Sequence, residues 1–412
     1  MKILLTSIGT RGDIEPFIAH GQILEEKGHK VFYAFPAQFS KLVPSHNQFY
    51  PLSPKIIELI HGEKGRTVMG NARLIAKIKA LWYLYKEGQK VNKDISIEHL
   101  EAIDQINPDV IVSNPKCSVP TLWTLKTGKP HIWLSPVPYV MHYVKNHAHL
   151  GFGSDYGSII NKLTYKLANF GLTKNIKGAT KHLPKDYSFS SSKIRKAILK
   201  SRMIFAVSPA LCPKQKYWPS HVEVTGYKKT KDNCKQPLSD EVIAFINRHE
   251  KVLFLTFGSM LSQDPKGISE LIYEALVETR IPAIVNTAAG GLIALEKFKQ
   301  HPDFLFTKTI DYNAIFPKIS AVVHHGGSGT THTALMHARP SIIVPHVIDQ
   351  FQWNRILHKK GVGPLGPSIN KLEKSEFKSK LLDMLSNDRY RKAAKKLANQ
   401  MNDGTQYVDI IS

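Results

Sequence analysis

The chain has 412 residues, more than a single hydrophobic core usually supports, so we expect two domains. Lysine and arginine number 56 against 33 aspartate and glutamate residues, which gives a formal net charge of +23. This excess can draw the protein to an anionic membrane surface. The lysines are dispersed and lack interleaved aromatic residues, so nucleic acid is not an expected partner.

The cysteines and the apolar runs indicate the cellular setting. Cys117, Cys212 and Cys234 are far apart and match neither a metal site nor a disulfide framework, which favours a reducing compartment. No stretch reaches the roughly 18 apolar residues of a membrane-spanning helix, and charged residues interrupt the start of the chain before a secretion signal can form. We therefore expect a cytoplasmic protein, peripheral at a membrane at most.

The first half of the chain begins with a βαβ pattern. Residues 1–6 form a short apolar strand, Gly9–Pro16 forms a loop, a helical pattern runs through Leu24, and a second strand covers residues 28–34. Further buried strands are predicted at residues 109–112, 131–134 and 203–207. The last of these is expected to close the first sheet.

Between Cys212 and Pro237 the chain becomes polar and lysine-rich, which indicates a linker with a boundary near Lys235. We therefore expect one domain at residues 1–235 and another at residues 236–412. The strand pattern then restarts, with predicted strands at residues 252–256, 283–286 and 304–306.

A glycine turn in the second half carries the clearest chemical signal. The apolar run Ala321–Val323 leads into His324–Thr331, which contains three glycines, and a helical segment follows. Glycine lets the backbone turn sharply, and the unpaired N–H groups at the start of a helix form an anion site reinforced by the helix dipole. The turn therefore fits a phosphate group, although an ordinary strand-to-helix loop has a similar spacing.

The next predicted strand ends shortly before Asp349 and Gln350, which a βαβ unit brings to the same edge of the sheet as the glycine turn. A carboxylate accepts hydrogen bonds from two hydroxyl groups, whereas an amide both donates and accepts. Such a pair suits the vicinal hydroxyls of a sugar. Together the two motifs predict a nucleotide-sugar site.

With these motifs in place, the chain resembles the family 1 glycosyltransferases. The segment from His325 to Gln350 resembles their donor-binding signature, and the doubled histidine is similar to the branch of sterol glucosyltransferases and bacterial antibiotic glycosyltransferases. Gly9–Pro16 and Phe257–Met260 resemble further landmarks of that branch. The resemblance implies the α/β GT-B fold, with two Rossmann-like doubly wound domains facing across a cleft, and a last helix that often crosses back to the first domain.

The resemblance also implies how the second domain would hold the donor. The expected phosphate contacts are His325, Gly327, Ser328, Gly329, Thr330 and Ser259. Asp349 and Gln350 would contact the sugar, and Ile310 the nucleotide base. His325 could instead be a packed histidine at a strand end. The chain departs from its relatives at Asp311–Tyr312, where they have proline followed by histidine or glutamine, and at Thr333, where plant-type enzymes carry a ribose-binding glutamate.

The expected catalytic base is Asp13. Many plant-type relatives carry histidine in a Gly-His-x-x-Pro loop, whereas Gly12–Pro16 places a carboxylate there, as in the antibiotic-modifying relatives. The aspartate that would orient such a histidine is also missing, because Ser113–Pro115 stands in its place. Alternatively, Asp13 pairs with Arg11 or caps a helix that begins near Pro16.

The acceptor site is the least defined part. Two aromatic-rich segments of the first domain contain Trp82 and, after a strand, Pro138, Tyr139 and Tyr143. They could line a pocket for an apolar alcohol of sterol, terpenoid, flavonoid or polyketide type, or they could belong to the core.

We therefore expect an inverting hexosyltransferase that moves a sugar, glucose from UDP-glucose, to a hydroxyl of a lipophilic small molecule. The chain has no Asp-x-Asp triplet of the metal-dependent glycosyltransferases, so neither a metal nor a cofactor is expected. The alternatives are a nucleotide-sugar epimerase of the same architecture and a non-catalytic binder of lipid or anions.

Overall fold

We describe the protein from a computed structural model. It describes residues 1–411 apart from 45–47, 56–57, 59–61, 63–73, 153–154, 232–236, 263 and 403–407, and it leaves out the side chains of 74–78, 80–82, 84–85 and 151. The chain forms two compact units. Among the described residues, unit 1 holds those up to 231 together with 408–411, and unit 2 holds those from 237 to 402.

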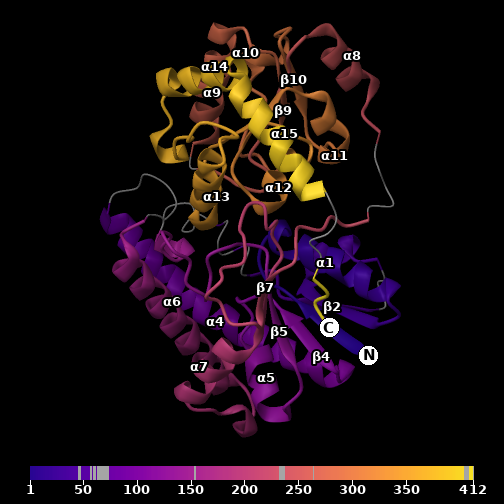
Figure 1. Ribbon diagram of the computed structural model, residues 1–412, viewed down its shortest axis with the longest axis vertical. Coiled ribbons are helices and arrows are strands. Elements are labelled where there is room, and N and C mark those ends of the chain that lie inside the picture. Colours follow the sequence, from indigo (N-terminus) through magenta and orange to yellow (C-terminus); the bar gives the residue numbers. More distant parts are fainter. Residues whose placement is uncertain are drawn as a thin grey trace. The chain divides into compact units, whose positions relative to one another are not determined.

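Unit 1 is built on one parallel sheet of seven strands with the order β3-β2-β1-β4-β5-β6-β7. The strands are β1 (Lys2–Thr6), β2 (Lys30–Pro36), β3 (Phe49–Leu52), β4 (Val110–Ser113), β5 (His131–Ser135), β6 (Arg202–Phe205) and β7 (Val222–Val224). Its helices are α1 (Arg11–Glu26), α4 (Leu74–Ile106), α5 (Val119–Thr127), α6 (Ser158–Ala179) and α7 (Ser191–Lys200). Figure 1 labels these elements.

Unit 2 repeats this plan with five parallel strands in the order β10-β9-β8-β11-β12. The strands are β8 (Leu253–Thr256), β9 (Ala283–Asn286), β10 (Phe304–Thr307), β11 (Ala321–His324) and β12 (Ser341–Ile343). The helices are α8 (Asp240–Arg248), α9 (Pro265–Thr279), α10 (Glu296–Lys299), α11 (Tyr312–Ile315), α12 (Ser328–Met336), α13 (Ile348–Lys359), α14 (Lys374–Ser386) and α15 (Asp388–Asn402).

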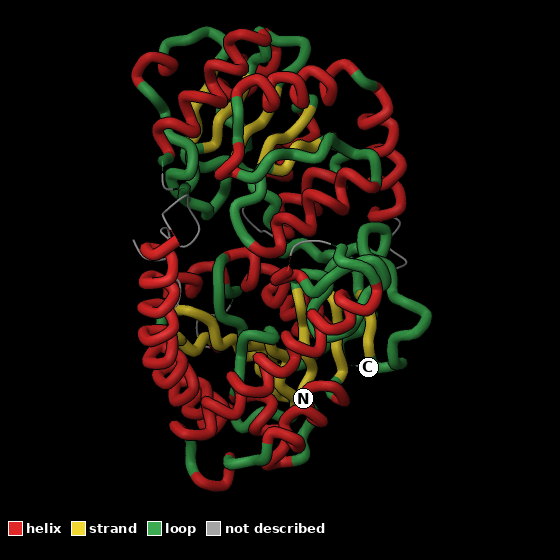
Figure 2. The backbone as a smooth tube through the Cα atoms, turned by 90° about the vertical axis from the view of Figure 1, so that its left-hand side faces the viewer, coloured by secondary structure: helices red, strands yellow, loops and turns green. Residues whose placement is uncertain are grey.

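Both sheets are covered by helices, and Figure 2 shows the strands of each unit lying among them. Strands covered on both faces are apolar throughout, which is why β1, β4, β8 and β11 read as short continuous apolar runs in the sequence. The doubly wound α/β fold predicted from the sequence is therefore confirmed. None of the helices in the described part of the chain has both the length and the apolar composition needed to cross a bilayer.

Two strands were not predicted, and both lie at the edges of the sheet of unit 1. β7 lies inside the segment interpreted as linker, so the prediction that residues 203–207 close the sheet was wrong. β7 has only three residues and alternates Val222, Glu223 and Val224. β3 contains Pro51, which an edge strand tolerates because one side of its backbone needs no ladder partner.

The end of the chain returns to unit 1, although the last helix does not. α15 packs on α12 within unit 2. The residues beyond it lie in unit 1, where Thr225 Oγ1 donates to the Val408 carbonyl over 2.7 Å and Arg202 donates to the Ile410 carbonyl over 3.2 Å. Ile410 is fully buried in the core of unit 1 beside β1 and α1. The final segment thus closes the packing of unit 1.

The packing of α1 on β2 leaves no room for a side chain at Gly21. A Cβ atom there would lie 2.4 Å from the hydroxyl oxygen of Tyr33 and 2.6 Å from its ring carbon Cε1. Tyr33 is fully buried, so its ring cannot move aside. We expect Gly21→Ala to lower the free energy of unfolding of unit 1 by about 1–3 kcal/mol, the usual cost of overpacking.

Gly171, in α6, is the matched control because a Cβ atom there meets nothing within 4 Å. Gly171→Ala should leave stability unchanged or raise it by up to about 1 kcal/mol, since alanine favours a helix. Denaturant unfolding of the two variants measures the difference. Equal stability of the two variants would contradict the packing described for Gly21.

Candidate active site

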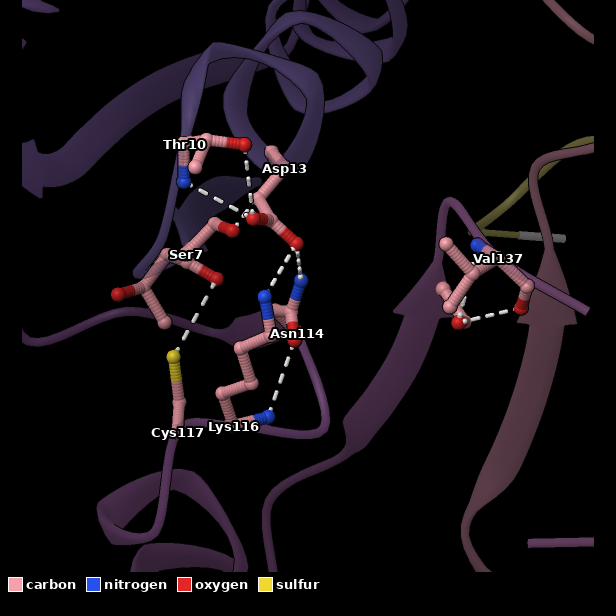
Figure 3. A network of polar contacts seen from close by, with 9 residues as sticks. Ser7, Thr10, Asp13, Asn114, Lys116, Cys117 and Val137 are labelled. Atoms are coloured by element: carbon pink, nitrogen blue, oxygen red, sulfur yellow. Dashed lines mark hydrogen bonds and ion pairs between the residues drawn. The ribbon is translucent and has the colours of Figure 1, made fainter. Parts of the chain in front are cut away.

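The sheet of unit 1 reverses its strand order between β1 and β4, which are neighbours in register with Thr6 opposite Ser113. The loops after these two strands meet, and Figure 3 shows the resulting network. Lys116 Nζ lies 2.6 Å from Asp13 Oδ1, and Asn114 Nδ2 lies 3.5 Å from the same oxygen. Ligands of doubly wound sheets bind at such switch points, outside the carboxyl ends of the strands.

Asp13 also stabilises the start of helix α1. Its Oδ2 accepts a hydrogen bond from the backbone N–H of Thr10 over 2.9 Å, and its backbone carbonyl accepts one from Ser7 Oγ over 2.9 Å. The helix therefore begins at Arg11 with Thr10 as its N-cap, not near Pro16, which lies inside the helix. Arg11 forms its ion pair with Glu15. The Asp13 carboxylate therefore does help to cap a helix, as the alternative prediction proposed.

A pocket in unit 1 lies next to this network. Lys116 and Ile8 line it together with residues of α4 and α6, among them His99 and Asn175. His99 is buried, its Nε2 lies 2.7 Å from Thr6 Oγ1, and burial lowers its pKa to about 4. The lining is mixed in polarity, and the enclosed space is too small for a molecule much larger than water.

The residues expected to bind the acceptor do not line this pocket. Pro138 and Tyr139 are buried, and the Tyr139 ring stacks on His147 with centroids 4.4 Å apart. Tyr143 packs edge-to-face on Tyr165 at 5.7 Å. Tyr139 and Tyr143 thus take part in aromatic packing after β5, whereas the side chain of Trp82 lies outside the described residues.

Unit 2 has its own switch point between β8 and β11, where Thr256 stands opposite His324. The loops that follow bring Gly258 and the glycine turn around the ring of His325. A Cβ atom at Gly258 would lie 2.9 Å from His325 Cε1, and one at Gly327 would lie 2.5 Å from His325 Nε2. Both glycines are needed because the imidazole occupies the space of their missing side chains. Ser259 follows directly and is partly exposed.

The start of α12 has the features of an anion site. Gly327 is its N-cap and provides no side-chain hydrogen bond, whereas Ser239 caps α8 through its hydroxyl. Ser328 is buried, and Gly329 and Thr330 are partly exposed in the first turn. Backbone N–H groups at an uncapped helix start attract an anion.

The polar atoms around this turn include two buried ones, His325 Nδ1 and Thr331 Oγ1, with no hydrogen-bond partner among the described residues. Burial lowers the pKa of His325 well below its usual value, and the neighbouring His324 and His346 lower it further. The imidazole is therefore neutral near pH 7 and acts through one N–H donor.

The pair predicted to bind the sugar lies at the start of α13. Gln350 is buried, and its Oε1 accepts hydrogen bonds from the backbone N–H groups of His346 over 2.7 Å and Val347 over 3.1 Å. Gly326 packs against it, because a Cβ atom there would lie 3.2 Å from Gln350 Cβ. Gln350 thus lies beside the glycine turn, and Asp349 precedes it in the same helical turn, partly exposed.

The loop expected to contact the nucleotide base is tied to the same sheet edge. Ile310 is partly buried against the core of unit 2. Asp311 caps α11 by accepting from the Asn313 N–H over 2.8 Å. The hydroxyl of Tyr312 lies 2.8 Å from Thr256 Oγ1, at the carboxyl end of β8. Asp311 and Tyr312 therefore anchor this loop to α11 and β8.

The sequence interpretation did not identify Lys116 or His99. Lys116 lies 103 residues after Asp13, and no local motif connects them. Its position four residues beyond the strand predicted at residues 109–112 was the available signal, since the carboxyl ends of neighbouring parallel strands meet at one edge. His99 lies in a helix without a recognisable motif.

Two family models match the chain. The family "Glycosyltransferase family 28 N-terminal domain" matches residues 3–123, and "Erythromycin biosynthesis protein CIII-like, C-terminal domain" matches residues 283–410. Among solved structures, the calicheamicin glycosyltransferase CalG4 has a TM-score of 0.68 at 14% identity, covering 97% of this chain and 94% of its own. The Streptomyces sp. SF2575 glycosyltransferase SsfS6, complexed with thymidine diphosphate, has a TM-score of 0.60 at 17% identity, covering 97% and 95%.

The fold is the GT-B architecture of glycosyltransferases, and the matches make the chain similar to that family. Within it, the chain is similar to a sterol 3-beta-glucosyltransferase of Arabidopsis thaliana, 28% identical over 98% of this chain and 63% of the relative. It is also similar to the UDP-sugar-dependent glycosyltransferase 52 of Dictyostelium discoideum, 24% identical over 97% of this chain and 25% of the relative. The chain spans less than two thirds of either relative. Neither is an epimerase, so that alternative gains no support.

The histidines around the glycine turn predict acid sensitivity of unit 2. His324 is fully buried, its Nδ1 accepts the Gly326 N–H over 3.1 Å, and burial lowers its pKa to about 3. Because the unfolded chain binds the proton first as pH falls, the stability gained from the neutral ring is complete above about pH 6.5 and is lost as pH falls from there toward 3.

We expect His324→Asn to weaken this dependence, since the asparagine Oδ1 can still accept from Gly326 but does not titrate. Scanning calorimetry between pH 7 and pH 4 should show a smaller fall in the Tm of unit 2 for the variant than for the natural protein. The same substitution at the exposed His358 is the control and should leave the fall unchanged. Parallel pH profiles for all three proteins would contradict the assignment.

Proposed function

We propose that the protein is an inverting glycosyltransferase that moves a hexose, glucose from UDP-glucose, to the hydroxyl of a lipophilic alcohol of sterol type, without a metal or cofactor. The observation that carries this proposal is the switch point of unit 2, where a glycine turn packs around the buried, neutral ring of His325 and leads into an uncapped helix start. The names of the relatives support the donor and acceptor classes.

The donor diphosphate would bind at the start of α12. The N–H groups of Ser328, Gly329 and Thr330, the hydroxyl of Thr330 and the turn at Ser259 would contact its oxygens, and the helix dipole would supply the positive potential. His325 would donate a hydrogen bond from its neutral ring to the departing diphosphate. Such preorganised donors stabilise the developing negative charge in place of a divalent cation.

The sugar would lie against Asp349 and Gln350. Because Gln350 Oε1 is used by the backbone of His346 and Val347, its amide nitrogen is the group that would donate to a sugar hydroxyl. Asp349 would accept from two neighbouring hydroxyls. Ile310 would contact the nucleotide base from the loop tied to β8.

Asp13 would act as the base for the acceptor. In this step the acceptor oxygen attacks the anomeric carbon, its proton passes to Asp13 Oδ1, and the bond between the anomeric carbon and the diphosphate oxygen breaks, with inversion. Lys116 Nζ lies 2.6 Å from that oxygen. Its side chain is 53% exposed while that of Asp13 is only 13% exposed, so the lysine can swing into solvent when an alcohol binds.

Replacement of Asp13 by asparagine tests the base. The variant should fold and bind UDP as before, because an asparagine Oδ1 can accept from the Thr10 N–H, but turnover should fall about 100- to 10,000-fold. Steady-state rates with UDP-glucose and a sterol, beside calorimetric titration of UDP, measure both properties. Glu15→Gln, on the same helix, is the control and should keep its rate.

Lys116→Met separates the base from a purely structural ion pair. If the pair only stabilises the loop, both variants should lose similar amounts of stability and activity. If Asp13 is the base, Lys116→Met should retain far more turnover than Asp13→Asn at equal stability. Retained activity in a folded Asp13→Asn protein would leave only the capping role.

Asp349 tests the sugar contact independently of the phosphates. Removing a carboxylate that accepts hydroxyl hydrogen bonds costs about 1.5–3 kcal/mol, so Asp349→Ala should weaken UDP-glucose binding roughly 10- to 100-fold. Binding of UDP, which lacks the sugar, should change less than about twofold. Calorimetric titration of both ligands gives the comparison. An equal loss for UDP and UDP-glucose would place Asp349 at the nucleotide or in the fold instead.

A further inference from the structure

Helix α6 differs from an ordinary surface helix in the side chains that it exposes. Its inward face buries the polar residues Asn161, Thr164 and Thr173, at 0%, 5% and 5% exposure, beside Tyr165, Ile176 and Ala179. Its outward face carries large apolar side chains, with exposures of 76% for Ile159, 52% for Ile160, 54% for Leu163, 57% for Leu167 and 58% for Phe170. A helix of a water-soluble protein normally turns its apolar stripe to the core. This one presents the stripe to its surroundings.

The exposed side chains form one continuous stripe. At 100° per residue, the five positions between Ile159 and Phe170 fall within an arc of about 100°. At 1.5 Å per residue the stripe is about 16 Å long. Phe152 and Tyr156, just before the helix, are also exposed. We call the side chains of Ile159, Ile160, Leu163, Leu167 and Phe170 the α6 stripe.

Hydrogen bonds from the inward face of α6 hold the helix with the stripe outward. Thr164 Oγ1 accepts from the backbone N–H of His149 over 2.9 Å, and Asn169 Nδ2 donates to the Met141 carbonyl over 2.9 Å. Asn161 Oδ1 accepts from a backbone N–H over 3.0 Å. Rotating the helix to bury the stripe would break these bonds and leave polar groups unsatisfied. The hydrogen bonds therefore fix the orientation in which the stripe faces outward.

The surroundings of the stripe are basic. Residues 158–200 contain ten lysine and arginine residues, and their one acidic residue, Asp186, pairs with Lys126. Lys162 and Lys166 lie along one border of the stripe and Lys174 extends it, all exposed. No ion pair involves these three lysines within the part of the chain that the structure describes. Figure 1 shows α6 beside α4 and α7 in unit 1.

We propose that the α6 stripe docks the protein on an anionic phospholipid bilayer. The apolar side chains would enter the boundary between headgroups and acyl chains, and the lysines would contact lipid phosphate and carboxylate groups. A second copy of this chain is a poor occupant, because two such surfaces would bring basic residues together. The inference goes beyond the proposed function, since docking requires neither donor nor acceptor.

Co-sedimentation with vesicles of phosphatidylcholine, alone or mixed with phosphatidylserine, tests the stripe. The natural protein should bind the anionic vesicles and bind the neutral ones weakly, if at all. The triple variant L163Q, L167Q, F170Q should bind anionic vesicles at least about tenfold less, since it loses the inserted apolar surface. The variant I243Q, L382Q removes exposed apolar side chains from α8 and α14 and should bind as the natural protein does.

The charge is tested by a matched pair of variants. K162Q, K166Q, K174Q removes three charges beside the stripe and should weaken binding to anionic vesicles at least about tenfold. K392Q, K395Q, K396Q removes three exposed charges from α15 and should weaken it far less. If both charge variants lose binding equally, the net charge and not the α6 surface attracts the membrane, and the proposal is wrong.

Two further outcomes would overturn the proposal. One is undiminished vesicle binding by the L163Q, L167Q, F170Q protein. The other is a dimer in sedimentation velocity that this variant abolishes, which would identify a second copy as the occupant. Circular dichroism checks that the variant folds, and Leu163→Gln alone replaces it if it does not. No sugar transfer is measured, so failure here leaves the proposed function untouched.

Discussion

The reversal of strand order in each sheet is the constraint on which the rest of the molecule depends. At β1/β4 and again at β8/β11, neighbouring strands send their following helices to opposite faces, because each crossover is right-handed. The carboxyl ends between them are therefore left uncovered by helices. The two units use this same edge for different chemistry. The loops of unit 1 place a carboxylate and an ammonium group there, and those of unit 2 place glycines and an imidazole.

The burial of the His325 imidazole would suit the proposed anion site. A buried cation without a partner is costly, so the ring stays neutral, and Gly258 and Gly327 give it room. The positive potential must then come from the backbone, and the uncapped start of α12 supplies it at the same position. A site of this kind contains no buried unpaired charge, so it does not lower the stability of the folded protein. It also explains why the turn contains so many glycines, since a Cβ atom would displace either the ring or the approaching backbone.

Much of this arrangement could be predicted from the sequence because buried parallel strands appear as apolar runs. β1, β4, β8 and β11 each have four or five residues without interruption by polar groups on either face, apart from their ends. The edge strands β3 and β7 escaped prediction because pairing on one side alone permits a proline or a glutamate. Lys116 escaped for another reason. Its contact with Asp13 depends on the pairing of β1 with β4, and no single segment of sequence contains that information.

The two roles considered for Asp13 are compatible, because each uses a different oxygen. The Thr10 N–H holds Oδ2 at the helix start, and this fixes the direction in which Oδ1 points. If Asp13 is the base, as proposed, the backbone of the preceding turn would orient it, where a histidine-based site uses an aspartate. Ser113 and Asn114 could then replace the orienting aspartate without leaving the base unsupported. The helix cap would make a single carboxylate sufficient, and Lys116 binds the oxygen to which an alcohol would donate.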